Sequence, residues 1–344
     1  MTFQFPVDSR EERRARYGRW ATTALSGIMV ALLAYLAYGA WEGSNQLVHP
    51  KRVSDCRLPS ALGWTYQAIN YDQASDAALA AEPDPDHCAS PGQPAGSDLV
   101  TTDGVPIAGW YIPAASGAGP QAPTVIVVHG HASNKNRMLP MAEVLHPAFN
   151  LVLFDLRNSG QSGGSETTLG VRERLDLEAV VAWLATTHGP ARVAVLGSSM
   201  GGITATNAVA ADLPVQALIL DSTPASNADA AQRRIENTGY PLSVPASWAV
   251  MLGTLLRTGV DVTAADAVLR IDEVRVPVLI LQGGADTAIH PDSATLLADA
   301  VLSGGGQAEV QICAAARHSQ LVEVCPDAYR DWVLGFLARN LGIP

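Results

Sequence analysis

The chain has 344 residues and is 48% hydrophobic, enough to bury the core of one large domain or two ordinary ones. Its formal net charge is −11, although residues 1–20 carry five arginines against three carboxylates and are therefore basic. An acidic body with one small basic tip argues against nucleic acid as a partner.

Residues 21–41, which follow the basic segment 1–20, contain no charged side chain. As a helix rising about 1.5 Å per residue, they match the roughly 30 Å hydrocarbon core of a bilayer, with Trp20 and Trp41 at the two interfaces. The arginines predict a cytoplasmic N-terminus and place everything after residue 41 across the membrane. The alternative is a signal peptide cleaved near Ala37-Tyr38-Gly39, giving a secreted protein. A buried core helix is disfavoured by the arginines before it.

Residues 42–97 are expected to form an extracytoplasmic juxtamembrane segment, because prolines and acidic residues gather toward its end. Asp84, Asp86 and His87 could suggest a metal site. Nothing in the pattern orders them as ligands, so a solvated loop is the better interpretation.

The four cysteines suit disulfides in an exported domain. Proximity in sequence favours Cys56 with Cys88 and Cys313 with Cys325, and the alternative is buried free thiols. No C-x-x-C spacing occurs, so a zinc site is not expected.

Residues 98–344 have the alternating pattern of an α/β domain. Asp103-Gly104, between two apolar runs, predicts a hairpin, and residues 169–186 have helical periodicity. Short apolar runs, typical of parallel strands buried on both faces, follow one another along the chain: Thr124 to Val128, Leu151 to Phe154, Val193 to Leu196, Ala217 to Leu220, Val278 to Leu281 and Glu309 to Ile312. The alternation predicts a mostly parallel, doubly wound sheet with an antiparallel start.

An insertion of about residues 222–276 interrupts this rhythm and is expected to form a helical cap over the carboxyl ends of the strands. The apolar run from Trp248 to Leu252, followed by Leu255 and Leu256, predicts a cap helix. That helix could line a substrate pocket, pack the cap onto the sheet, or do both.

The pentapeptide Gly197-Ser198-Ser199-Met200-Gly201 joins a buried-type strand to a helix rich in small residues. This is the pattern of a nucleophile elbow, in which two glycines let strand and helix approach and expose the Ser199 hydroxyl in a strained turn.

A serine nucleophile needs a base and an acid that orients the base, in the chain order serine, acid, histidine. Only His290 and His318 follow Ser199 among the histidines. His318, just past the last predicted strand, is the better base, because His290 precedes a proline and a predicted helix. Asp286 follows Gly283-Gly284 beyond a strand and is the predicted acid, with Asp221 at the preceding strand end as its rival.

The oxyanion of an acyl transfer needs backbone donors. The Met200 N–H at the start of a helix is one candidate, and the His131 N–H in His129-Gly130-His131 is the other. The two histidine side chains could suggest a metal, but a structural His-Gly turn is favoured.

Residues 98–341 resemble the α/β-hydrolase fold superfamily. The resemblance is carried by His129-Gly130, the segments 154–162, 197–201 and 283–286, and His318, and the stretch from Asp155 to Thr168 resembles its Bem46-like, serine-aminopeptidase-like branch. It implies that Asp155, Arg157, Gly160 and Ser162 shape the loop beside the active site. The sequence lacks the additional glycines of the HGGG lipase type, so esters of bulky alcohols gain no support.

We therefore expect a serine hydrolase that cleaves an ester, thioester or amide through an acyl-enzyme, with esters favoured over peptides. The substrate is expected to be a small-molecule or lipid-like acyl compound, with no cofactor or metal. The alternatives are an acyltransferase using the same residues and a non-catalytic, membrane-anchored binding module. Dehalogenase chemistry is disfavoured because it wants a carboxylate at position 199.

Overall fold

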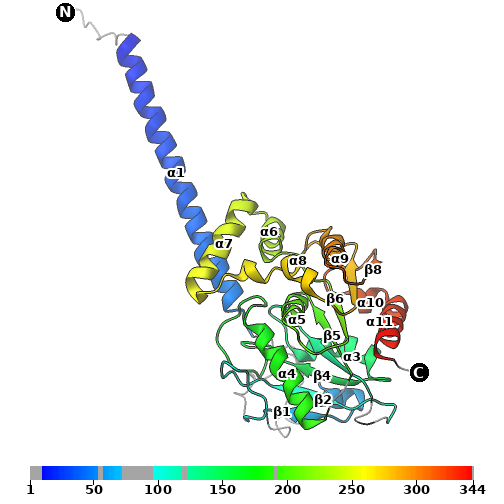
Figure 1. The fold of residues 1–344 in the computed structure, drawn as a ribbon. Helices are drawn as coiled ribbons and strands as arrows, with labels where there is room; N and C mark the ends of the chain where they lie inside the picture. The colour runs from blue at the N-terminus through cyan, green and yellow to red at the C-terminus, as the bar shows by residue number, and fades with distance from the viewer. Residues whose placement is uncertain are drawn as a thin grey trace, which may run out of the picture.

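The computed structural model describes residues 10–52, 57–71, 96–117, 119, 122–189 and 192–342. A long helix, α1 (Arg10–Val48), projects from an α/β body (Figure 1). The body is built on one eight-stranded sheet in the order β1-β2-β4-β3-β5-β6-β7-β8. Its strands are β1 (Gln67–Ile69), β2 (Gly109–Ile112), β3 (Thr124–Val128), β4 (Asn150–Phe154), β5 (Val193–Ser198), β6 (Ala217–Asp221), β7 (Val278–Gly283) and β8 (Ala308–Cys313).

The sheet has the predicted mixed topology. β2 pairs antiparallel with β1 and β4, whereas β4, β3, β5, β6, β7 and β8 pair parallel in that order. Each apolar run predicted as a parallel strand forms one. Three of them extend past their apolar residues to Ser198, Asp221 and Gly283, so that polar or flexible residues stand at the carboxyl edge.

Helices cover both faces of the sheet, so the fold is doubly wound as expected. One buried apolar cluster joins α4, α5 and α9 to the sheet, and a second joins α3 and α11 to its other face. The helices of the body are α3 (Leu139–Leu145), α4 (Glu173–Thr187), α5 (Met200–Ala210), α9 (Ser293–Ser303), α10 (Leu321–Val324) and α11 (Pro326–Leu341).

Two details of the antiparallel start differ from the sequence-based expectation. Instead of a full hairpin around Asp103-Gly104, the structure has a single bridge between Val100 and Pro106. β1, which lies in the expected juxtamembrane segment, was not predicted, because three residues beginning with the exposed Gln67 carry too little apolar pattern.

The chain between β6 and β7 forms a helical cap of α6 (Asn227–Asn237), α7 (Ser243–Thr258) and α8 (Ala267–Arg270). α7 contains the predicted cap helix, but it does not simply pack the cap onto the sheet. Val250 and Met251 are buried, whereas Trp248, Leu252 and Leu256 are exposed. In Figure 1, α7 lies alongside the end of α1 that joins the body.

α1 is longer than the predicted span of residues 21–41, because the helix continues at both ends. It is the one helix among the described residues that is long and apolar enough to cross a membrane. Its side chains from Leu25 to Leu33 are largely exposed, whereas its last turns pack on the body. The predicted Cys56–Cys88 pair and the Asp84, Asp86 and His87 cluster lie outside the described residues.

Candidate active site

Ser199 occupies a sharp turn between β5 and α5. Its backbone has φ 54° and ψ −120°, a conformation that strains a residue with a side chain. A Cβ on Gly197 would collide with the Gly201 carbonyl, and one on Gly201 would collide with the Val128 carbonyl. The two glycines therefore allow strand, turn and helix to pack closely enough to hold the serine, as the pentapeptide predicts.

Ser199, His318 and Asp286 form one chain of hydrogen bonds. His318 Nε2 lies 2.9 Å from Ser199 Oγ, and His318 Nδ1 lies 2.7 Å from Asp286 Oδ2. The Asp286 side chain is fully buried, whereas His318 is partly exposed. The structure thus brings together three residues that are 87 and 32 positions apart in sequence, from the ends of β5, β7 and β8.

Backbone amides fix the Asp286 carboxylate. Its Oδ1 accepts hydrogen bonds from Ala288 N at 2.8 Å and Ile289 N at 3.3 Å, which leaves Oδ2 for the histidine. An ionised carboxylate in this position holds the imidazole in the tautomer with its proton on Nδ1. Nε2 is then free to accept the serine proton.

A disulfide closes the loop that carries His318. Cys313 ends β8, Cys325 follows α10, and the two are bonded as predicted. The bridge restricts the position of the loop independently of the packing around it.

The alternative base, His290, and the alternative acid, Asp221, do not take part in this hydrogen-bond chain. His290 precedes α9, where its Nδ1 accepts a hydrogen bond from Asp292 N. Asp221 is buried beneath the site, and its Oδ1 accepts a hydrogen bond from Ser222 Oγ at 2.9 Å. Burial raises the pKa of Asp221 to about 6, while Ser222 and the Tyr329 hydroxyl beside it oppose the shift.

Ser222 is a site residue that the sequence reasoning missed. Besides donating to Asp221, its hydroxyl accepts a hydrogen bond from Ser319 N at 3.0 Å. The Ser319 hydroxyl in turn lies 3.1 Å from Ser198 Oγ. These contacts hold the residue after His318 to the ends of β5 and β6. A single serine after a strand has no sequence pattern that would have predicted these hydrogen bonds.

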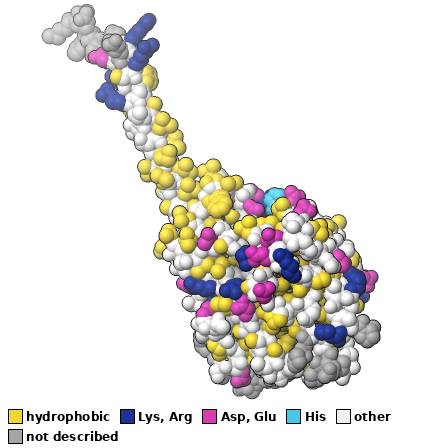
Figure 2. Space-filling view, viewed as in Figure 1, with side chains coloured by type: hydrophobic (Ala, Val, Ile, Leu, Met, Phe, Trp, Pro, Cys, Tyr) yellow, Lys and Arg dark blue, Asp and Glu magenta, His cyan; other side chains and the backbone are white. Residues whose placement is uncertain are grey.

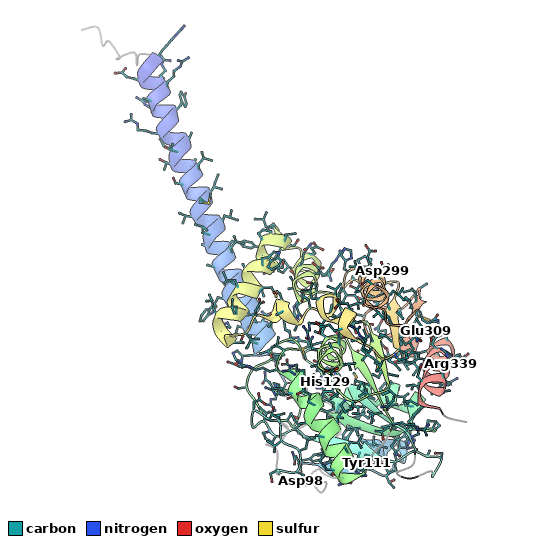
Figure 3. All side chains as sticks on the ribbon, in the orientation of Figure 1. Asp98, Tyr111, His129, Asp299, Glu309 and Arg339 are labelled. Carbon is teal, nitrogen blue, oxygen red and sulfur yellow. A yellow bond between two sulfur atoms is a disulfide. The ribbon has the colours of Figure 1, made fainter. Side chains whose placement is uncertain are left out.

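The loop after β3 lies directly against the nucleophile. A Cβ on Gly130 would be 3.1 Å from the Ser199 Cβ, so the glycine permits the approach. His129 is fully buried inside the body (Figure 3), where its Nδ1 bonds to Gly130 O and its Nε2 accepts from Leu156 N. Burial lowers the pKa of His129, in keeping with a neutral ring that holds the turn.

The His131 side chain has a role that the sequence did not indicate. Its Nε2 lies 2.9 Å from the carbonyl oxygen of Leu47, in the last turn of α1. Carbonyls at a helix end lack intrahelical partners, and the Val48 carbonyl likewise accepts hydrogen bonds from Asn158 and Thr167. Burial lowers the pKa of His131 as well. The loop that touches the nucleophile therefore also caps the apolar helix.

The segment from Asp155 to Ser162 is fixed by two buried ion pairs and one partly buried ion pair. Lys135 Nζ lies 2.7 Å from Asp155 Oδ2 and 2.7 Å from Gln161 Oε1. Although burial opposes it, the Lys135 ammonium lowers the pKa of Asp155. Arg157 binds both Asp103 and Asp176 at 2.7 Å. These contacts are structural, in line with the role that the family resemblance implies for this loop.

Comparison with known proteins agrees with the fold. The family model of the alpha/beta hydrolase fold matches residues 123–240. The chain has the α/β-hydrolase fold. Within it, protein bem46 of Schizosaccharomyces pombe is 25% identical over 71% of this chain and 74% of its own length, which supports the Bem46-like branch.

Other relatives and solved structures are similar to this chain at 32% identity or less. The uncharacterized protein Rv2307c of Mycobacterium tuberculosis is 32% identical over 57% of the chain, and the match spans 64% of that relative. The Pyrococcus furiosus esterase Pf2001 superposes with a TM-score of 0.66 over 86% of this chain and 99% of its own, at 24% identity. A puromycin-hydrolyzing peptidase of Mycobacterium tuberculosis superposes with a TM-score of 0.58 over 72% of this chain and 39% of its own, at 19% identity. The fold is thus shared with esterases and peptidases alike.

Proposed function

We propose that the protein is a membrane-anchored serine hydrolase that cleaves an ester, thioester or amide through an acyl-enzyme on Ser199. The observation that carries the proposal is the unbroken hydrogen-bond chain from Ser199 through His318 to Asp286, set on a strained elbow. Such a chain supplies a nucleophile, a base and an orienting acid within reach of one another.

In the first half-reaction, Ser199 Oγ attacks the substrate carbonyl carbon while its proton passes to His318 Nε2. Asp286 stabilises the resulting imidazolium. The carbonyl oxygen becomes an oxyanion, for which the backbone N–H groups of Met200 and His131 are the proposed donors. The intermediate collapses when the bond to the leaving group breaks and that group takes the proton from His318.

In the second half-reaction, water loses a proton to His318 and attacks the acyl carbon of the ester on Ser199. The bond to Ser199 Oγ breaks, the serine recovers its proton, and the acid leaves. An alcohol in place of water would give acyl transfer with the same residues.

Membrane anchoring is the second element of the proposal. The uncharged residues 21–41 within α1 supply a span, and the arginines before them favour a cytoplasmic N-terminus with the hydrolase body on the other side. An exported body also suits the Cys313–Cys325 disulfide.

The test is labelling with a fluorophosphonate probe, which reacts with an activated serine. The native protein should be labelled and Ser199→Ala should not, with circular dichroism establishing that both are folded. A folded native protein that stays unlabelled would instead indicate a non-catalytic binding module. A panel of p-nitrophenyl esters and aminoacyl substrates, with and without an alcohol acceptor, then separates esterase, peptidase and acyltransferase activities.

A further inference from the structure

The last turns of α1 and the cap enclose a cavity of about 250 Å³. On one side it is lined by residues of α1 from Tyr35 to Leu47, and on the other by residues of α6, α7 and the turn between them. Most of the lining is apolar or aromatic, including Tyr38, Ile235 and Val250, and its charged side chains are Arg234 and Glu42. We call this space the α1–cap cleft.

The contact that forms the cleft is specific. Small residues let α1 and α7 cross closely, since a Cβ on Gly253 would collide with the Ala40 carbonyl. Tyr35 Oη donates to Pro241 O at 2.7 Å, and Arg257 donates to the Trp41 carbonyl at 2.7 Å. α1 is therefore tied to the cap at Tyr35 and at Trp41.

At its inner end the cleft is connected to the candidate active site through the His131 side chain. Leu47 lines the cleft, and its carbonyl binds His131, whose neighbour Gly130 packs against Ser199. The positive charge of Arg234 acts on the same histidine. From Tyr35 to Leu47 the helix advances about 18 Å at 1.5 Å per residue, so the cleft is elongated along α1.

The outer end of the cleft adjoins apolar surface. Residues 35–41 belong both to the uncharged segment of α1 and to the stretch of helix that packs on the cap. On α7, Val244, Trp248, Leu252 and Leu256 lie four residues apart and are each at least half exposed. Figure 2 shows hydrophobic side chains continuing from the projecting helix onto the body where the two join. A bilayer around α1 would meet this surface.

We propose that the α1–cap cleft holds the acyl chain of an amphipathic ester, which enters it from the bilayer and presents its carbonyl to Ser199. This inference rests on the proposed hydrolase function. An elongated apolar cleft fits an aliphatic chain better than a peptide, whose backbone needs hydrogen-bond partners. Because α1 and the exposed face of α7 lie beside its outer end, the chain would not have to cross water.

Gly39 offers a way to fill the cleft with little disturbance, since it lines the cavity and a Cβ on it would meet no atom within 4 Å. Gly27 has equally open surroundings, lies on the exposed part of the same helix and does not line the cleft, so it is the matched control. We would compare Gly39→Phe and Gly27→Phe in the full chain, reconstituted in nanodiscs. The substrates are p-nitrophenyl acetate and p-nitrophenyl palmitate.

Gly39→Phe should lower kcat/KM for the palmitate ester at least tenfold and leave that for the acetate ester within twofold, whereas Gly27→Phe should change neither. Equal effects of Gly39→Phe on both esters, or no effect on either, would overturn the inference. In either event the native protein would still be labelled at Ser199 and would still hydrolyse the acetate ester, so the proposed hydrolase would stand. A folded native protein that is not labelled would refute both the proposed hydrolase and the acyl-chain assignment.

A second measurement needs no variant. A long-chain alkyl fluorophosphonate with a diazirine at the chain end should label Ser199 and, on irradiation, cross-link to residues between Tyr35 and Leu47 or to α6 or α7. Cross-links confined to other elements would place the chain elsewhere and refute the assignment.

Discussion

Two regions meet at His131, and they are built in different ways. The elbow and its partners depend on short stretches at strand ends, held by backbone geometry: Ser199 at φ 54°, glycines where a Cβ would collide, and backbone amides on Asp286. The α1–cap cleft depends on side chains of α1 and of the cap helices α6 and α7, which lie some two hundred residues later in the sequence. Many proteins of one fold can carry the same catalytic arrangement, whereas the elements around it determine which substrates reach the nucleophile.

The largest expected effect concerns the choice of acid. Asp286→Asn should lower kcat by about 10⁴-fold, because the amide favours the wrong imidazole tautomer. Asp221→Asn is the matched control and should stay within about tenfold, since Asp221 bonds to Ser222 and not to His318. Steady-state ester hydrolysis measures both. A larger loss in the Asp221 variant would reverse the assignment of the acid.

The elbow should also be intolerant of a single methyl group. Gly201→Ala places a Cβ against the Val128 carbonyl and should cost more than about 3 kcal/mol in free energy of unfolding. Gly335→Ala in α11 has no atom closer than 3.5 Å and should raise stability by about 0.5–1 kcal/mol. Denaturant titrations compare them, and a stable Gly201 variant would show that the elbow can relax.

The disulfide links stability to the position of His318. The double substitution Cys313→Ser and Cys325→Ser should cost about 3 kcal/mol of stability, from the entropy of the short loop that the bond closes. Ester hydrolysis should fall while the far-ultraviolet circular dichroism stays native at 25 °C. Unchanged activity would mean that packing alone positions the histidine.

Asp221 predicts a pH dependence of stability. Its native pKa of about 6 lies above the ordinary value of 3.8, so the folded state retains this proton longer than the unfolded chain. The stabilisation is complete below about pH 4 and is lost as the pH rises through about 6, which amounts to about 2–3 kcal/mol. Asp221→Asn should lack this fall. If the free energy of unfolding depended on pH in the same way in the native protein and in Asp221→Asn, the raised pKa of Asp221 would be contradicted.

The smallest effect is expected where α1 meets the cap. Arg257 donates to Ser44 Oγ and the Trp41 carbonyl, each at 2.7 Å, and stacks on the Trp41 ring. Arg257→Ala should destabilise the α1–α7 contact by about 1–2 kcal/mol, seen as faster hydrogen exchange in α7. Arg233→Ala, which removes only a surface pair with Glu236, is the control. Equal exchange in both would show that apolar packing alone holds α1.

The sequence by itself determined the parallel strands, the elbow at Ser199 and the two residues that the structure places beside it, His318 and Asp286. These features have local causes: buried strands need apolar runs, tight turns need glycine, and the order of functional residues follows the order of strands. The Cys313–Cys325 bond was predictable for the same reason, since its loop is short.

Only the tertiary structure decided what surrounds the elbow. The length of α1, its packing on α7, the capping of Leu47 by His131 and the role of Ser222 all depend on contacts between distant segments. The apolar pattern of α7 was visible, but a helix with two apolar faces does not reveal which face meets a neighbour. Contacts of this kind form when distant segments pack together, and they produce no repeating pattern in the amino-acid sequence.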